Sequence, residues 1–273
     1  MRRILQLLKN VRSVNALRRF NYASKNYFFD KYLQMIRWVI NSKEDTNYTY
    51  HLTEENLNYL AQTIAFITKS NFSSIIGYFS EAQQNKELIQ HIQTTIQNSD
   101  QKKFTDKEVR FGRRLGWYAF VRILKPKIVI ETGVDKGLGS VLICSALLEN
   151  KKEGFYGRYF GTDINPKAGF LLTGKYKEVG EILYGDSIDS LSGFKENIDI
   201  FINDSDHSSH YEYREYNTVK PLLGEKGIIL GDNAHCTDQL SKFSLENDRH
   251  FLYFQEKPKN HWYPGGGIGI SFK

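Results

Sequence analysis

Apolar and polar positions along the second half of the chain form a series of short apolar runs with helix-like segments between them. Five of these runs end next to a glycine, an acid or an amide, at residues 128–131, 159–163, 181–184, 198–202 and 227–230. Runs of this length and composition are typical of buried parallel strands. Two more strands are expected at 250–254 and 267–272, with no room for a helix between them, which indicates an antiparallel pair. The pattern therefore predicts an α/β fold with a mostly parallel sheet.

The first hundred residues have helical spacing instead. Apolar residues recur every three or four positions in segments 26–42, 53–67 and 88–96. A polar stretch at 97–103 is the candidate linker. We therefore divide the chain into a helical N-terminal region, residues 1–103, and a second region, residues 104–273.

The segment that leads into the first strand has a helix-start signal. Thr105-Asp-Lys-Glu108 fits the capping-box pattern and predicts a helix from there to about Leu124. This helix carries Arg110, Arg113 and Arg114, which could meet an acidic ligand group but are expected mainly on a solvated face.

Charge is concentrated at the N-terminus. The 273 residues have a formal net charge of +6, and residues 1–20 hold six of the 37 basic residues and no acid. The remaining 31 basic residues equal the 31 acidic ones, so nucleic acid is disfavoured as a partner of the second region. Segment 1–20 is also amphipathic, which fits docking on the body or on a partner subunit, or weak contact with an anionic membrane surface. Docking is the favoured interpretation.

The sequence shows neither a membrane-spanning segment nor a secretory signal. No apolar run has the length of a membrane span, and no secretory signal pattern is visible. Cys144 and Cys236 lack metal-type spacing and are expected to be reduced thiols. We therefore expect a cytoplasmic protein, at most peripheral to the inner membrane face.

The candidate chemistry lies where the strands end. The first strand ends in Glu131 and is followed by three closely spaced glycines, Gly133, Gly137 and Gly139. Acids or amides also follow the next four strands, at Asp163, Asp186, Asp204, and Asp232 with Asn233. Ligands of open α/β sheets bind beyond the carboxyl ends of the strands, where these side chains should gather. The glycine spacing differs from the G-x-G-x-x-G pattern of dinucleotide-binding folds.

This order of motifs resembles the class I S-adenosylmethionine (SAM)-dependent methyltransferases over about residues 105–273. The resemblance implies a Rossmann-like, seven-stranded sheet with a final antiparallel strand and SAM bound over its first half. It implies that Glu131 and the loop residues Gly133, Gly137, Gly139 and Ser140 meet the methionine part of SAM. It further implies that Asp163 holds the ribose, that Asp186 and Ser187 face the adenine, and that Asp204 also borders the cofactor.

The later motifs are similar to the cation-dependent O-methyltransferases of the catechol, caffeoyl-CoA and macrolide-sugar types. Asp204, Asp232 and Asn233 would supply an all-oxygen half-shell suited to Mg²⁺ or a similar divalent cation. His207 would be the general base, at a position where catechol-type enzymes have lysine. Asp206 and Asn233 could instead cap helices. His210 and His235 are expected at the surface.

The sequence therefore predicts a SAM- and metal-dependent O-methyltransferase that acts on a hydroxyl of a small molecule, with a sugar or glycan as the suggested acceptor. One alternative is a metal-independent N- or RNA methyltransferase of the same fold. Another is a non-catalytic SAM-binding scaffold. The N-terminal region could act as a substrate lid, a homo-oligomerisation arm or an attachment segment, and the loop with Trp262 and Tyr263 could face the substrate or be a plain connection.

Overall fold

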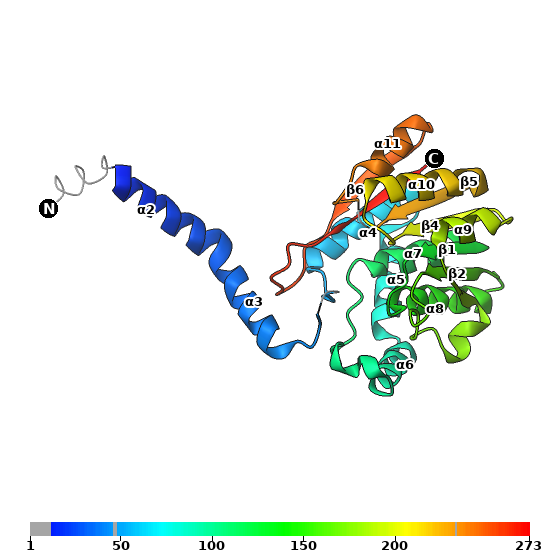
Figure 1. Ribbon diagram of the computed structural model, residues 1–273, viewed down its shortest axis with the longest axis horizontal. Coiled ribbons are helices and arrows are strands. Elements are labelled where there is room, and N and C mark those ends of the chain that lie inside the picture. Colours follow the sequence, from blue (N-terminus) through cyan, green and yellow to red (C-terminus); the bar gives the residue numbers. More distant parts are fainter. Residues whose placement is uncertain (1–11, 46–47, 233) are drawn as a thin grey trace.

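The computed structural model of the protein describes residues 12–45, 48–232 and 234–273. Its centre is a seven-stranded sheet with the strand order β3-β2-β1-β4-β5-β7-β6 (Figure 1). The strands are β1 Ile128–Thr132, β2 Arg158–Asp163, β3 Gly180–Tyr184, β4 Ile198–Asn203, β5 Leu223–Gly231, β6 His250–Gln255 and β7 Gly267–Phe272. Strands β1 to β5 pair in parallel, whereas β7 pairs antiparallel with both β5 and β6. The predicted fold class is confirmed.

Helices cover both faces of the sheet, and the alternation of side chains along each strand decides which face a residue serves. In β1, Val129 packs into the core shared with the N-terminal helices, whereas Ile128 and Ile130 pack on the other side. The first layer contains α4 Glu54–Thr68, α5 Phe72–Gln84, α6 Lys86–Gln97, α7 Arg114–Leu124 and α8 Leu138–Lys152. The second contains α9 Ser187–Gly193, α10 Ser209–Val219 and α11 Gln239–Glu246.

The N-terminal helices α4 to α6 share one apolar core with the sheet. Leu60 in α4, Ile75 in α5 and Ile92 in α6 are fully buried in the same cluster as Trp117 of α7. The division at residue 103 stays a prediction. A short 3-10 helix, Asp100–Lys103, follows α6 within the polar stretch.

One helix prediction requires correction, and one helix was not predicted. The helix expected from Thr105 begins only at Arg114. The Asp106 carboxylate accepts hydrogen bonds from the Lys43 amide (2.8 Å) and the Ser42 hydroxyl (3.1 Å), so it ties the segment to the N-terminal region rather than to a helix start. Helix α5 was not predicted at all. Thr53, by contrast, caps α4 as expected, because its side chain accepts a hydrogen bond from the Asn56 amide.

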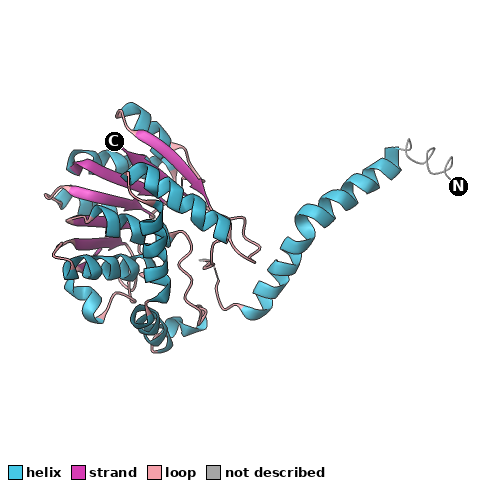
Figure 2. Ribbon diagram, turned by 180° about the vertical axis from the view of Figure 1, so that it is seen from behind, coloured by secondary structure: helices cyan, strands magenta, loops and turns pink. Residues whose placement is uncertain are grey.

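The helices before α4 extend away from the body. Helices α2 Arg12–Ala23 and α3 Phe29–Asn41 are joined by a π-helical turn, Ser24–Phe28, and project as one long arm (Figure 2). Within the described residues, no helix combines the length and the apolar character that crossing a bilayer would require.

Candidate active site

The glycine loop between β1 and α8 is shaped by close backbone contacts. Gly133 has a φ of +78°, and a Cβ atom there would lie 2.2 Å from the carbonyl oxygen of Asp204. Gly137 has a φ of +86° and caps α8, and a Cβ on it would meet the backbone of Gly169 at 2.9 Å. Both positions therefore need glycine, for conformation and for space. The loop in this way packs directly on the segment that follows β4.

Glu131 and Ser140 lie beneath this loop rather than in the cavity. The Tyr159 hydroxyl donates to the Glu131 carboxylate at 2.5 Å, and the Ser140 hydroxyl donates to it at 3.4 Å. Gly139 is needed here, because a Cβ on it would lie 2.5 Å from a Glu131 oxygen. Burial raises the pKa of Glu131 to about 7, although the hydrogen bond from Tyr159 opposes the shift.

Asp163, at the end of β2, organises the start of the glycine loop. One carboxylate oxygen accepts the backbone amides of Val134 (3.1 Å) and Asp135 (3.0 Å), and the other accepts the amide of Asn165 (2.8 Å). A carboxylate has about four acceptor positions, so Asp163 retains capacity for a ligand hydroxyl beside these three bonds. The Thr162 hydroxyl oxygen, one residue earlier, is buried and has no hydrogen-bond partner.

A cavity of about 770 Å³ opens at the carboxyl ends of the strands. The sequence-predicted residues that line it are Gly133, Asp163, Asp186, Ser187, Asp204, His207 and Asp232. The predicted residues Glu131, Gly137, Gly139 and Ser140 shape the loop from behind and do not line it. Asn233 lies outside the described residues. The strand-end positions of the sequence are thus brought together around one space, as expected for an open α/β sheet.

Asp186 and Ser187 are held by the start of α9 and by a buried acid. The Asp186 carboxylate accepts the amide of Ile188 at 2.8 Å and caps α9. The Ser187 hydroxyl donates to Glu215, which also accepts hydrogen bonds from Asn203 and from the Ser205 hydroxyl. Burial raises the pKa of Glu215. The sequence interpretation missed Glu215, because its contacts come from α10 and leave no mark in a strand-end motif.

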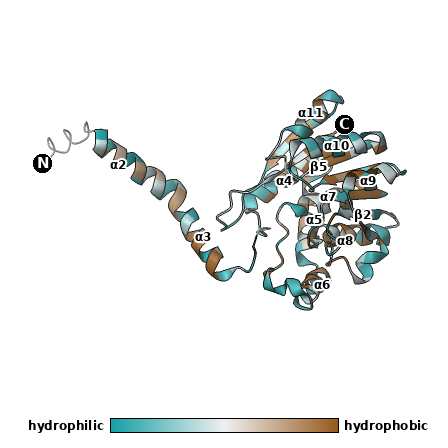
Figure 3. Ribbon diagram, in the orientation of Figure 1, coloured by the Kyte–Doolittle hydropathy of each residue, from teal (hydrophilic) through white to brown (hydrophobic). Residues whose placement is uncertain are grey.

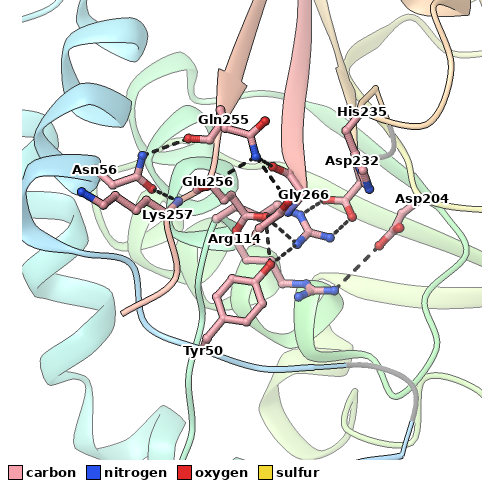
Figure 4. Close-up of polar contacts among 12 residues, drawn as sticks. Tyr50, Asn56, Arg114, Asp204, Asp232, His235, Gln255, Glu256, Lys257 and Gly266 are labelled. Carbon is pink, nitrogen blue, oxygen red and sulfur yellow. Dashed lines mark hydrogen bonds and ion pairs between the residues drawn. The ribbon is translucent and has the colours of Figure 1, made fainter. Parts of the chain in front are cut away.

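Two arginines occupy the acidic corner of the cavity, contrary to the expected solvated face (Figure 4). The Arg113 guanidinium bonds both carboxylate oxygens of Asp232, and its third nitrogen donates to Glu256 at 3.1 Å. The side chain of Arg113 is 15% exposed, and those of Asp232 and Glu256 are fully buried. A nitrogen of Arg114 lies 3.8 Å from a carboxylate oxygen of Asp204. Burial by itself would raise the pKa of Asp232, but Arg113 outweighs it and keeps this pKa below its ordinary value.

The predicted divalent-cation site does not fit this arrangement. A hard cation needs carboxylate lone pairs directed at it, whereas Arg113 takes both oxygens of Asp232 and a guanidinium already faces Asp204. Across residues 12–45, 48–232 and 234–273, no group of three or more His, Cys, Asp or Glu side chains is arranged to hold a metal ion. Positive charge at this corner comes from the two arginines.

Two histidines line the cavity, and His235 lies at the arginine corner, beside Asp232 (Figure 4). His207 follows β4, and His235 follows β5. Burial and the nearby Arg113 lower the pKa of His235, so its imidazole is neutral at pH 7. His235 is exposed, as expected, and it also lines the cavity. Asp206 accepts the amide of Ser208 (2.8 Å) in the turn before α10. His210 does not line the cavity.

The N-terminal region and the last loop complete the wall. Tyr48, Thr49 and Tyr50 line the cavity together with Tyr263. The Tyr50 hydroxyl donates to Glu256 at 2.9 Å and lies 3.3 Å from Arg113, so the same ion network fixes both the acidic corner and this aromatic wall. Neither Tyr50 nor Arg113 belongs to a strand-end motif. The sequence interpretation named Arg113 only as a possible partner of an acidic ligand group and did not single out Tyr50.

Comparison with known proteins agrees with this geometry. Residues 130–234, which run from β1 past β5, match the family model described as a methyltransferase domain. This segment of the chain is therefore similar to a methyltransferase domain. The fold is that of the class I SAM-dependent methyltransferases. A search of curated proteins found no significant match.

Solved structures of methyltransferases share the fold at low sequence identity. The O-methyltransferase TomG from Streptomyces achromogenes, involved in tomaymycin synthesis and solved with SAM, is 14% identical, with a TM-score of 0.52 over 73% of this chain and 95% of its own. An O-methyltransferase from Bacillus cereus, solved with S-adenosylhomocysteine (SAH), is 14% identical, with a TM-score of 0.50 over 72% and 96%. The SAH-bound methyltransferase PaMTH1 from Podospora anserina is 16% identical, with a TM-score of 0.50 over 75% and 97%.

Proposed function

We propose that this methyltransferase transfers a methyl group from SAM to a hydroxyl group of a small molecule, with His207 as the general base. The observation that carries the proposal is that one cavity is lined by Gly133 of the glycine loop, by Asp163 and Asp186, and by two histidines. SAM supplies an electrophilic methyl group on a sulfonium centre. Two of the three solved structures described above are O-methyltransferases, which favours oxygen as the acceptor atom.

The cofactor half of the cavity would bind SAM through groups that fit its parts. Asp163 has acceptor capacity for ribose hydroxyls, and the buried, unpartnered hydroxyl of Thr162 lines the same wall. Asp186 and Ser187 border the region expected to hold the adenine. Because Gly133 has no side chain, the loop backbone can approach the ligand closely.

In the acceptor half, an imidazole would remove the proton of the attacking hydroxyl. Histidine suits this role because its ordinary pKa lies near neutrality, and a positioned base contributes roughly 10²- to 10⁴-fold to the rate. His207 is the proposed base, and His235, which lines the same cavity, is the competing candidate. Tyr50 and Tyr263 would orient the acceptor and keep water away from it.

A divalent cation is not part of the proposal. The carboxylates that were expected to bind it are engaged by Arg113 and Arg114, so these guanidinium groups would provide the local positive charge instead. A fixed cationic group next to developing charge can stabilise it without any change of protonation. The proposed reaction therefore proceeds in the presence of a chelator.

RNA is a poor fit as the acceptor. Six aspartates line the cavity, namely Asp135, Asp163, Asp186, Asp204, Asp206 and Asp232. Only three basic side chains, Arg113, Arg114 and Lys136, accompany them. A phosphate backbone requires the opposite balance of charge.

The proposal is tested by methyl transfer from radiolabelled SAM to a panel of hydroxylated and amino small molecules, with EDTA or with Mg²⁺. We expect transfer to hydroxyl acceptors, equal in both buffers. His207→Ala should lose about 100-fold or more of the turnover, and His210→Ala, a matched histidine outside the cavity, should keep it. Transfer only to amines, or activity that requires Mg²⁺, would overturn the acceptor or the metal-free part respectively. Binding of SAM without any turnover would favour the scaffold alternative.

A further inference from the structure

The helical arm, residues 12–41, leaves most of one side without contacts to the body. Helices α2 and α3 extend beyond the sheet and its layers in both views (Figures 1 and 2). The arm contacts the body through helix α3, toward its C-terminal end. Lys31 donates to the carbonyl oxygen of His261 at 2.8 Å, and the Trp38 ring packs edge-on against Tyr48 and Trp262, with centroids 5.3 Å and 5.4 Å away.

Helix α3 has two opposite faces. Lys31, Gln34 and Trp38 are partly buried and form the face toward the body. At about 100° per residue, the opposite face carries the exposed residues Phe29, Leu33, Ile36 and Ile40. Figure 3 shows helix α3 as the most hydrophobic part of the arm. Further exposed apolar residues lie along the arm, at Leu17, Phe20, Phe28, Tyr32 and Val39. A contiguous exposed apolar surface of this kind marks an interaction site.

The charge of the arm selects the kind of partner. Residues 12–41 hold six basic residues, Arg12, Arg18, Arg19, Lys25, Lys31 and Arg37, and one acid, Asp30. Residues 42–273 hold 28 basic and 30 acidic residues, so the body has a net charge of −2. Pairing of two arms would bring twelve basic residues together, and their repulsion opposes such a dimer. An anionic surface instead complements both the bases and the apolar face.

Aromatic side chains agree with a lipid surface. Six aromatic residues of the arm are more than half exposed: Phe20, Tyr22, Tyr27, Phe28, Phe29 and Tyr32. Tyrosine rings settle at the headgroup level of a bilayer, and helices with basic and apolar faces lie in the plane of the interface. We propose that the arm of residues 12–41 binds an anionic lipid membrane, with its exposed apolar face at the acyl boundary.

Membrane binding would bring the catalytic cavity close to the lipid surface. Tyr48, Thr49 and Tyr50, which come a short distance after the arm in the sequence, line the cavity, and Trp38 of the arm packs on Tyr48. The inference rests on the arm alone and does not depend on the proposed chemistry.

The test is co-sedimentation of the full chain with vesicles of phosphatidylcholine, with or without one-third phosphatidylglycerol. We expect binding to the anionic vesicles only, and a loss on raising the salt concentration. The triple variant Phe29→Ser, Ile36→Ser, Ile40→Ser should lose binding. The triple variant Arg18→Gln, Arg19→Gln, Lys25→Gln should weaken it about 100-fold, since each basic residue near an anionic surface contributes about fivefold.

Three exposed apolar residues of the body provide the matched control. Phe66→Ser, Tyr156→Ser and Leu245→Ser together should leave vesicle binding unchanged. Circular dichroism melting shows whether each variant folds, and sedimentation velocity measures self-association of the same samples. Equal binding of the wild type and the apolar-face variant would overturn the inference. A wild-type dimer that does not bind vesicles and becomes a monomer in that variant would overturn it in favour of a second copy.

Discussion

Replacement of Glu131 by glutamine should change how the stability of the protein depends on pH. Burial raises the folded-state pKa of Glu131 from 4.5 to about 7. Between these values the unfolded chain releases the proton while the folded chain keeps it, so the free energy of unfolding falls as the pH rises. One pKa unit corresponds to about 1.36 kcal/mol, so this one carboxyl should remove about 3 kcal/mol between pH 4 and pH 8. Glutamine has no proton to lose and can still accept the hydrogen bond from Tyr159.

The assay is urea unfolding of wild type and Glu131→Gln at pH 4 and pH 8, because the difference between the two proteins cancels other titrating groups. We expect the wild type to lose about 3 kcal/mol relative to the variant over this range. Glu181→Gln, at an exposed glutamate of β3, should show no such change. A constant difference between wild type and Glu131→Gln at both pH values would refute the reasoning, since Glu131 would then have the same pKa folded and unfolded.

Three further predictions concern the ion network, the loop and the base. Arg113→Gln should cost about 3–5 kcal/mol of unfolding free energy, because it leaves buried carboxylates unpaired, whereas Arg158→Gln at an exposed ion pair should cost at most about 1 kcal/mol. Equal losses in the two would contradict the burial argument. Gly133→Ala should lose SAH binding in calorimetry and should destabilise the fold by about 1–2 kcal/mol or more, because the residue has a positive φ and no space for a Cβ. Unchanged binding would show that the loop can relax. In methyl-transfer assays, His207→Ala should lower kcat far more than His235→Ala, and the reverse order would transfer the role of base to His235.

The fold was largely predictable because its signals are local. Each of the seven strands is a largely apolar run, five of these runs end beside a glycine, acid or amide, and the structure contains all seven strands. Helix α5 escaped notice although Phe72, Ile75, Ile76 and Phe79 have helical spacing. The capping box at Thr105 misled because its acids have partners far away in the sequence, including the Lys43 amide.

The candidate site was predictable only in part. The strand-end aspartates surround the cavity as expected, because parallel strands place their carboxyl ends at one edge of the sheet. The sequence did not reveal that arginine side chains lie against two of these aspartates. Arg113 and Asp232 are 119 positions apart, and only the tertiary fold brings the start of α7 to the end of β5. This contact changes the chemistry expected of the acidic corner from metal binding to an ion network.

The central claim, that the strand-end cavity binds the methyl donor, is tested most directly by calorimetric titration of SAH. The comparison is between wild type, Asp163→Ala and Asp199→Ala. Asp199 also accepts two successive backbone amides, those of Lys127 (2.7 Å) and Ile128 (3.0 Å), but it does not line the cavity. The account predicts binding by the wild type and by Asp199→Ala, and its loss in Asp163→Ala at equal thermal stability. Absence of binding in the wild type, or undiminished binding in Asp163→Ala, would contradict it.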